Sequence, residues 1–237
     1  MNDTKPLLQH FLELRKRCIV SIAAIITAFV IVFYFFSTRL LNFITLPLKQ
    51  YGVEVIYTTV SEAIITQLKI SFVAGVIIAS PVIIWQIWKF IKPALYAKEI
   101  RAFKIYFFLT LALFLSGVVF CYTCIYNLAI KFFLVSSKNL ANPLISIDKY
   151  LNFMLSFLLP FGAAFDLPVI IYITTKIGLT TPQMLISKFK YVVLLIFIVA
   201  AILTPPDVLS QVMLAIPLLV LYGVGILVAK KVKPAEE

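Results

Sequence analysis

The sequence is poor in the residues from which most catalytic and metal sites are built. It contains a single histidine, His10, so neither a histidine-based metal site nor a Ser–His–Asp triad can be assembled from it. HExxH, GxSxG and P-loop patterns are also missing from the sequence. We therefore predict that the protein is not an enzyme and that it holds neither a metal nor a cofactor.

Cysteine is also scarce, with three residues in the whole sequence. All of them lie in or beside apolar runs, and an odd number in such a place does not indicate a disulfide framework. Cys121 and Cys124 have the CxxC spacing, but no further cysteine or histidine stands near them. Packing between helices is therefore a better interpretation of this pair than a metal site.

Charged residues are also few, and their low share indicates the class of protein. Charged residues make up 13% of the sequence and hydrophobic residues 62%, with a mean hydropathy of +1.06. Soluble domains have roughly 25% charged and 45–50% apolar residues, so this composition indicates a membrane protein that spans the bilayer several times. The net charge of +11 does not indicate nucleic-acid binding, because the basic residues flank the apolar runs, where membrane topology explains them.

The apolar runs predict an all-α membrane protein with six transmembrane helices. Residues 1–17 are predicted to form an amphipathic helix on the cytoplasmic membrane surface, residues 18–229 the membrane domain, and residues 230–237 a cytoplasmic tail. The stretches Thr38–Ser61 and Leu128–Lys149 are predicted loops, the second with a helical cap at Ile130–Val135. The predicted spans are Cys18–Ser37, Ile64–Ile87, Ile105–Tyr126, Tyr150–Thr175, Phe189–Leu203 and Val208–Ala229.

The distribution of basic residues predicts the direction in which these helices run. The stretch from Trp88 to Lys104 carries five bases, and a short base-rich loop stays in the cytoplasm because Lys and Arg resist translocation. With the N-terminus inside, the cytoplasmic segments hold 15 of the 21 Lys and Arg residues. Both termini are therefore predicted to be cytoplasmic.

Two acidic residues fall among the bases on the predicted cytoplasmic side. Glu13 and Glu99 are each followed two residues later by an arginine, Arg15 and Arg101. Pairing with nearby bases along the same helix is one interpretation. The other is a receptor with two carboxylates for cationic side chains, for which arginine is suited because its planar fork binds carboxylates in a bidentate manner.

Asp166 lies well inside the fourth predicted span, between Pro160 and Pro168. An ionised carboxylate at bilayer depth costs roughly 2.5–3.5 kcal/mol on insertion scales, so intramembrane acids are usually functional. Either Asp166 bonds to backbone groups that these prolines leave unpaired, or it serves a partner helix or a proton relay. Gln211, early in the sixth span, either packs internally or bonds to a partner helix.

Four motifs, in order along the chain, resemble the TatC family, the large subunit of the twin-arginine protein translocase. The resemblance extends over essentially the whole length of the chain. It is specific because four separate motifs occur in the same order as in the family. The motifs are His10-Phe-Leu-Glu-Leu-Arg-Lys-Arg17, Ser80-Pro-Val-Ile-Ile-Trp-Gln-Ile-Trp88 continuing into Pro93-Ala-Leu-Tyr-Ala-Lys-Glu99, Phe161-Gly-Ala-Ala-Phe-Asp-Leu-Pro168, and Leu203-Thr-Pro-Pro-Asp-Val-Leu-Ser-Gln211.

The resemblance implies a concave, glove-like bundle in the bacterial cytoplasmic membrane or an equivalent organelle membrane. It implies that Glu13 and Glu99, with Arg15, recognise the twin-arginine signal peptides of folded cargo proteins. Asp166 stands where the family often has Glu. Pro47 matches a proline of the first exoplasmic loop, and Pro205, Asp207 and Gln211 fall at a functional turn.

The partners implied by the resemblance are TatA-type and TatB-type single-span subunits, docked on the short fifth and sixth helices. Self-association and contact with membrane lipid are implied as well. Transport is then driven by the proton-motive force, without covalent chemistry. The alternative function is a proton-coupled small-molecule carrier with Asp166 as its relay, although the two halves of the sequence show no evident repeat.

Overall fold

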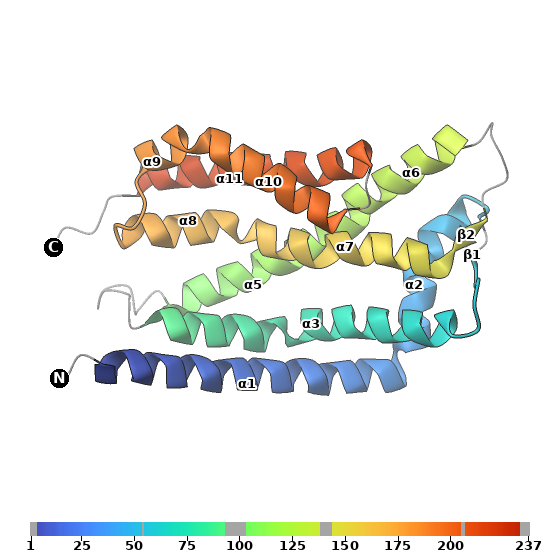
Figure 1. Cartoon of the computed structure of the whole chain (residues 1–237), viewed down its shortest axis with the longest axis horizontal. Coiled ribbons are helices and arrows are strands. Elements are labelled where there is room, and N and C mark those ends of the chain that lie inside the picture. The colour runs from blue at the N-terminus through green and yellow to red at the C-terminus, as the bar shows by residue number, and fades with distance from the viewer. Residues whose placement is uncertain (1–3, 54, 93–102, 138–143, 205–206, 233–237) are drawn as a thin grey trace. The chain divides into compact units, whose positions relative to one another are not determined.

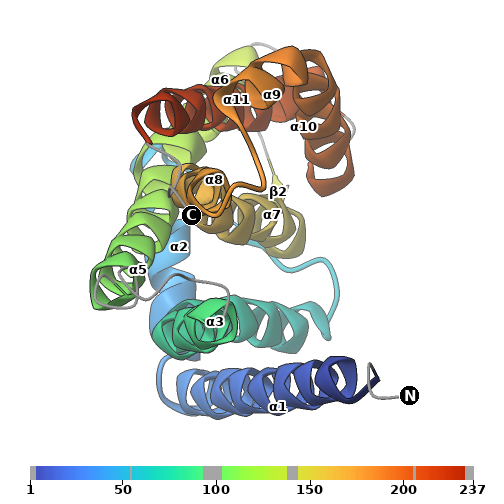
Figure 2. The ribbon, with the colours of Figure 1, turned by 90° about the vertical axis from the view of Figure 1, so that its left-hand side faces the viewer.

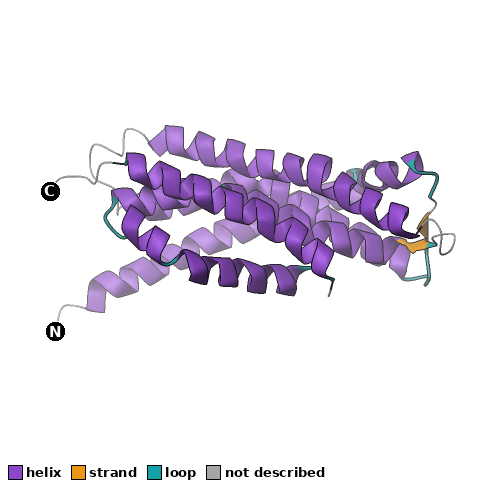
Figure 3. Cartoon of the chain, turned by 90° about the horizontal axis from the view of Figure 1, so that it is seen from above, coloured by secondary structure: helices purple, strands orange, loops and turns teal. Residues whose placement is uncertain are grey.

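The computed structural model describes residues 4–53, 55–92, 103–137, 144–204 and 207–232, and these are almost entirely helical (Figures 1 and 3). They belong to two compact units. Unit 1 is Met1–Leu40 with Gln67–Leu111, and unit 2 is Leu41–Thr66 with Ala112–Glu237. The elements in order are α1 (Thr4–Phe35), α2 (Ser37–Gln50), β1 (Val55–Ile56), α3 (Glu62–Ile91), α5 (Phe103–Phe120), a π-helical turn (Cys121–Ile125), α6 (Tyr126–Ser137), β2 (Ile145–Ser146), α7 (Ile147–Phe165), α8 (Leu167–Lys176), α9 (Pro182–Ser187), α10 (Phe189–Leu203) and α11 (Val208–Lys231).

Among the described residues, six segments are apolar helices of the kind expected to cross a bilayer. Five of them are long enough by themselves, and the sixth, α10, is shorter. The bounds of α10 are those predicted from the sequence. At about 1.5 Å per residue it is only ~22 Å long, against a hydrocarbon thickness of about 30 Å. The five long spans are Phe11–Phe35, Glu62–Ile91, Phe103–Leu134, Ile147–Lys176 and Val208–Lys231.

The predicted place of residues 1–17 on the cytoplasmic membrane surface stays a prediction, but residues 4–17 do not form a helix separate from the first span. They continue into it as the single helix α1 of 32 residues. A helix that turns from the membrane surface into the bilayer needs a break, and a sharp break almost always occurs at proline or glycine. Neither residue occurs between Leu7 and Phe35, so the helix continues.

Both predicted loops are also largely helical. The stretch predicted as a loop over Thr38–Ser61 contains most of α2, in which Ile44, Thr45 and Leu48 are buried at helical spacing. The third span does not stop at Tyr126 but passes through the π-helical turn into α6. In the fourth span the helix breaks only at Asp166, whereas Pro160 lies inside α7.

In unit 1, α1 and α3 lie side by side and in close contact (Figure 1). A Cβ atom at Gly75 of α3 would lie 2.9 Å from the backbone nitrogen of Phe29 in α1. Trp88, near the end of α3, is buried and donates a hydrogen bond from Nε1 to the Thr110 hydroxyl at 3.2 Å. Its indole ring also stacks on Tyr106. Glycine at position 75 thus sets how closely α1 approaches α3.

Replacing Gly75 by alanine is expected to destabilise the protein by about 1–3 kcal/mol, because the added methyl meets backbone rather than a flexible side chain. The matched control is Gly223→Ala in α11, where the new Cβ would meet nothing within 4 Å. That change should be neutral or slightly stabilising, since alanine is the better helix former. The measurement is the apparent melting temperature in detergent, and equal shifts for the two variants would contradict the packing argument.

In unit 2, α11 packs along α8, and α9 and α10 lie against α11 (Figures 1 and 2). The Tyr222 hydroxyl on α11 donates to the Leu185 carbonyl on α9 at 3.0 Å. At the other end of this unit, β1 and β2 form a two-stranded parallel sheet that pairs Val55 with Ile145 and Ile56 with Ser146. We call α2 from residue 41, β1, residues 57–62, β2 and the first turn of α7 the cap.

Candidate functional site

Glu13 lies on α1, before the apolar part of that helix. Its side chain is 37% exposed and accepts a hydrogen bond and ion pair from Arg17, one helical turn later. Arg15 is exposed on the same helix. Glu13 therefore pairs with a base on its own helix, as one of the two interpretations expected, and its carboxylate stays partly accessible. Glu99 lies outside the described residues.

Asp166 occupies the break between α7 and α8 in unit 2. Pro168 follows as the second residue of α8, a position where the missing N–H leaves no helical hydrogen bond unmade. The side chain is 9% exposed and does not cap α8, although Asp166 is the residue before that helix. Its Oδ1 atom has no hydrogen-bond partner within the described chain. The backbone groups near the prolines therefore do not satisfy this atom.

Asp207 and Gln211 lie at the start of α11, and both make bonds within unit 2. The Asp207 carboxylate caps the helix by accepting from the Ser210 backbone N–H at 2.7 Å. The Gln211 side chain donates from Nε2 to the Phe197 carbonyl of α10 at 3.0 Å, so it ties α10 and α11 together. Of the two alternatives for Gln211, internal packing or a bond to a partner helix, the structure shows internal packing. Pro205 lies outside the described residues.

The face of α10 turned away from α11 is largely exposed, and only Ile196 and Ala200 of this helix are buried. Between α7, α10 and α11 runs a hollow of about 280 Å³ with apolar walls. Figure 2 shows α10 at the edge of the helices of unit 2. The residues lining the hollow are Pro160, Ala163, Ala164, Leu167, Ile196, Val199, Ala200, Leu203, Leu214 and Leu218.

Glu62, which the sequence analysis did not select, is a buried carboxylate at the cap. It is 5% exposed and begins α3. Its Oε2 accepts from the Thr58 backbone N–H, from the Thr58 hydroxyl at 2.7 Å and from the Thr59 N–H at 3.2 Å. Its Oε1 accepts from the Ser146 hydroxyl at 2.6 Å and the Asp148 N–H at 3.0 Å. One carboxylate thus joins the start of α3 to the start of α7.

A local signal for this residue was present in the sequence. Thr59-Val-Ser-Glu62 has the T-x-x-E spacing of a capping box, in which the acid bonds back to the backbone N–H of the residue three positions before it. The bond from the Thr59 N–H to Glu62 is of this kind. The bonds to Ser146 and Asp148 join residues more than eighty positions apart, and no local pattern encodes them.

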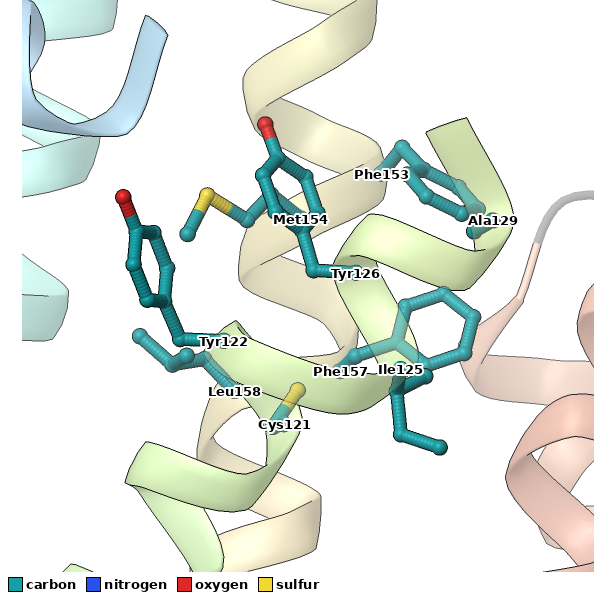
Figure 4. A pocket seen from close by; sticks show the side chains of 9 residues that line it. All are labelled: Cys121, Tyr122, Ile125, Tyr126, Ala129, Phe153, Met154, Phe157 and Leu158. Carbon is teal, nitrogen blue, oxygen red and sulfur yellow. The ribbon is translucent and has the colours of Figure 1, made fainter. Parts of the chain in front are cut away.

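The CxxC pair contributes packing in the part of the chain that the structure describes. Cys121 is buried and Cys124 exposed, and both thiols are free. Beside Cys121 is a small apolar cavity of about 10 Å³, formed by the π-helical turn, α6 and α7 (Figure 4). No group of three or more metal-ligating side chains is found among the described residues.

The candidate residues are therefore distributed over both units. Glu13 and Arg15 belong to unit 1, whereas Pro47, Asp166, Asp207 and Gln211 belong to unit 2. Within unit 2, Asp207 and Gln211 lie together at the start of α11, and Pro47 lies inside α2 at the cap.

Comparison with known proteins gives a consistent result over nearly the whole chain. The family described as Sec-independent protein translocase protein (TatC) matches residues 9–217. Proteins named Sec-independent protein translocase protein TatC from Carboxydothermus hydrogenoformans and Aquifex aeolicus are 39% and 42% identical to this chain. The first comparison covers 99% of this chain and 97% of the relative, and the second covers 95% of each.

A solved structure agrees with these sequence relatives. The crystal structure described as the twin arginine translocase receptor TatC is 41% identical, with a TM-score of 0.87, over 93% of this chain and 98% of that one. This likeness confirms the predicted all-α membrane fold, whereas the cytoplasmic placement of the termini stays a prediction. Of the fifth and sixth spans, both expected to be short, only α10 is short among the described residues, because α11 has 24 residues. The carrier alternative gains no support from these similarities. The chain belongs to the TatC family of Sec-independent protein translocase proteins.

Proposed function

We propose that this chain is the receptor subunit of a twin-arginine translocase in the inner membrane, binding the signal peptides of folded proteins. The observation that supports this most directly is its 41% identity, over 93% of its length, to a structure described as the twin arginine translocase receptor. Glu13 and Glu99 are the proposed ligands of the two signal arginines, with Arg15 beside Glu13. The role is binding and assembly, driven by the proton-motive force and without bond-making chemistry.

The geometry at Glu13 supports a carboxylate whose partner can be exchanged. Its bond to Arg17 is an ion pair between residues four apart on one helix, in which the Glu13 side chain is 37% exposed and the Arg17 side chain 17%. Pairs with this spacing on a helix surface are worth only about 0.3–0.5 kcal/mol. A signal arginine that binds two carboxylates together gains more than the internal pair loses, because hydrogen bonds to charged groups contribute about 1.5–3 kcal/mol each. The internal pair therefore weakens the site slightly and does not close it.

Partner subunits of the TatA and TatB type are proposed to dock on α10 and α11. The support is the exposure of α10 and the apolar hollow of about 280 Å³ beside it, which suit the side chains of a single membrane-spanning helix. The Oδ1 atom of Asp166 has no partner within the described chain, so a donor from a partner helix would satisfy it. Self-association is proposed to involve the cap with Pro47, as the resemblance implies.

Replacing Arg17 by glutamine tests the site at Glu13. Removal of this internal competitor is expected to tighten the binding of a twin-arginine peptide about twofold, the equivalent of an ion pair with this spacing on a helix. The matched control is Lys16→Gln, which removes the same charge one residue earlier. The measurement is the Kd of a labelled twin-arginine peptide on the protein in nanodiscs, with a twin-lysine peptide as the ligand control.

The two variants change the net charge equally, so the difference between their peptide affinities reports the loss of the bond to Glu13 and not the loss of a positive charge. Equal affinities for both variants would remove Glu13 from the proposed site. No binding of the twin-arginine peptide to the unaltered protein, under conditions where the solved relative binds it, would overturn the proposed function as a whole.

A further inference from the structure

Pro47 stands inside the helix α2 and leaves a gap in its hydrogen bonds. Proline has no backbone N–H, so it cannot donate to the carbonyl four residues earlier, and its ring presses against that carbonyl. In α2 this is the carbonyl of Phe43. A backbone carbonyl left without a donor costs free energy wherever water is excluded.

A tyrosine from another part of unit 2 supplies the missing donor. The hydroxyl of Tyr122, in the π-helical turn, donates to the Phe43 carbonyl at 3.0 Å. The phenyl ring of Phe43 stacks on the Tyr122 ring with a centroid distance of 4.9 Å and an interplanar angle of 16°. Tyr122 is thus held at its ring as well as at its hydroxyl.

Two further tyrosines donate to the next carbonyl, that of Ile44. The Tyr150 hydroxyl on α7 lies 2.8 Å from it, and the Tyr126 hydroxyl at the start of α6 lies 3.3 Å from it. Both side chains are buried, with 6% and 2% exposure, so their hydroxyls need partners inside the protein. Three hydroxyls from three elements therefore meet two adjacent carbonyls of one helix.

The π-helical turn places two of these tyrosines on the same side. In this turn the Tyr126 N–H bonds to the carbonyl of Cys121, five residues earlier, which widens the helix locally. The Tyr122 and Tyr126 rings stack with a centroid distance of 5.9 Å and an interplanar angle of 18°. Figure 4 shows the two hydroxyls pointing the same way, away from Cys121 and Phe157, which line the small cavity together with both tyrosines.

We propose that Tyr122, Tyr126 and Tyr150 are positioning residues for translocation that together hold α2 against the π-helical turn, α6 and α7. Tyr122 replaces the hydrogen bond that Pro47 cannot make, and Tyr126 and Tyr150 add a second attachment at the Ile44 carbonyl. We call this set the tyrosine clamp. Its role in translocation rests on the proposed function, whereas its role in holding α2 does not. The clamp explains how a proline is accommodated in a helix that the cap needs in one position.

A double-mutant cycle tests the clamp without relying on transport. Tyr122→Phe is expected to lower the apparent melting temperature by about 2–6 °C, because the Phe43 carbonyl loses its donor. In the Pro47→Ala background the same change should cost less than about 1 °C, since the introduced backbone N–H then donates to that carbonyl. Equal losses in both backgrounds would overturn the proposal, because the Tyr122 hydroxyl and Pro47 would then be independent.

Two comparisons complete the cycle. Tyr150→Phe should cost about the same in both backgrounds, because Ile44 is not the carbonyl that residue 47 serves. Tyr51→Phe is the matched control, since Tyr51 follows the end of α2 with an exposed ring and should shift neither background. Rescue of Tyr150→Phe or a loss for Tyr51→Phe would point to a general effect of the kink and would contradict the atomic assignment.

The transport readout separates positioning from folding. In cells that depend on this protein, Tyr122→Phe is expected to slow export of a twin-arginine reporter about three- to tenfold, while the Kd of the twin-arginine peptide stays unchanged. Unchanged export, or loss of peptide binding along with export, would overturn the positioning role. If the unaltered protein exports nothing, the proposed function fails, and the melting cycle still decides whether the clamp exists.

Discussion

Glu62→Ala is expected to open the cap and to lower the apparent melting temperature by more than about 5 °C. The substitution removes the acceptor for three backbone N–H groups and two hydroxyls at once. Donors left unpaired in a buried place each cost stability, and here they belong to segments far apart in sequence. The start of α7 should then separate from the start of α3.

Hydrogen exchange locates the effect within the cap. The amides of Thr58, Thr59 and Asp148 should exchange at least about tenfold faster in Glu62→Ala, because their bonded state becomes less populated. The matched variant is Glu62→Gln, which keeps the shape but offers an acceptor on one side only. It should protect either the Thr58 side or the Asp148 side. Uniform protection in both variants would show that the carboxylate does not hold the cap.

Replacing both Glu13 and Glu99 by alanine is expected to weaken the binding of a twin-arginine peptide by ~10²–10⁴-fold. Each carboxylate contributes about 1.5–3 kcal/mol as the acceptor of a charged hydrogen bond, and 1.4 kcal/mol corresponds to tenfold in affinity. Each single variant should lose ~10–100-fold. Binding is measured by photocrosslinking and by the Kd of a labelled peptide in nanodiscs.

Folding has to be unchanged for this loss to be meaningful. Arg17, one of the partners of Glu13, lies four residues later on the same helix, and such a pair contributes little to stability, so the substitutions should leave the apparent melting temperature within about 1 °C. A twin-lysine peptide should bind the unaltered protein weakly, since lysine lacks the planar fork. Crosslinking of the twin-arginine peptide to the double variant at wild-type strength would remove these residues from the site.

The membrane segments were the part of the fold that the sequence predicted best. The bounds of α10 are correct because its apolar run is bordered by Lys188 and Lys190 on one side and by Thr204 and its prolines on the other. The length of an apolar run is a local property of the sequence, and the thickness of the bilayer sets how long such a run must be to span it. The number of apolar segments and the all-α class followed from the same signal.

The cap was predicted poorly because its structure depends on contacts that are distant in sequence. The helix α2 is amphipathic and contains Pro47, so both its polarity and its proline indicated a loop. What makes it a helix is the burial of Leu48 and Ile44 together with the tyrosine clamp. Glu62 shows the same limit, because its capping box is local while its bonds to Ser146 and Asp148 are not.

The sequence predicted which residues are candidates for the site better than it predicted the contacts that these residues make. Both Pro160 and Pro168 were expected to interrupt the fourth span, but only Pro168 accompanies a break, at Asp166. The lack of a partner for the Asp166 Oδ1 atom within the described chain was not predicted. For Glu13 the spacing allowed both an internal pair and a ligand, and the structure realises the pair with Arg17. For Gln211 only the fold shows that the partner is the Phe197 carbonyl.

The unbroken helix α1 has a mechanical consequence. This helix has 32 residues, contains no glycine, and has proline only in its first turn. Because sharp bends almost always occur at such residues, we expect α1 to bend little and to move as one rigid rod. It touches α3 closely where Phe29 meets Gly75, about 24 Å along the axis from Glu13 at 1.5 Å per residue. A tilt of about 10° around that contact would move the turn at Glu13 by roughly 4 Å. We therefore expect a ligand that displaces this end of the helix to move the opposite end in the reverse direction, with no relay of side chains in between.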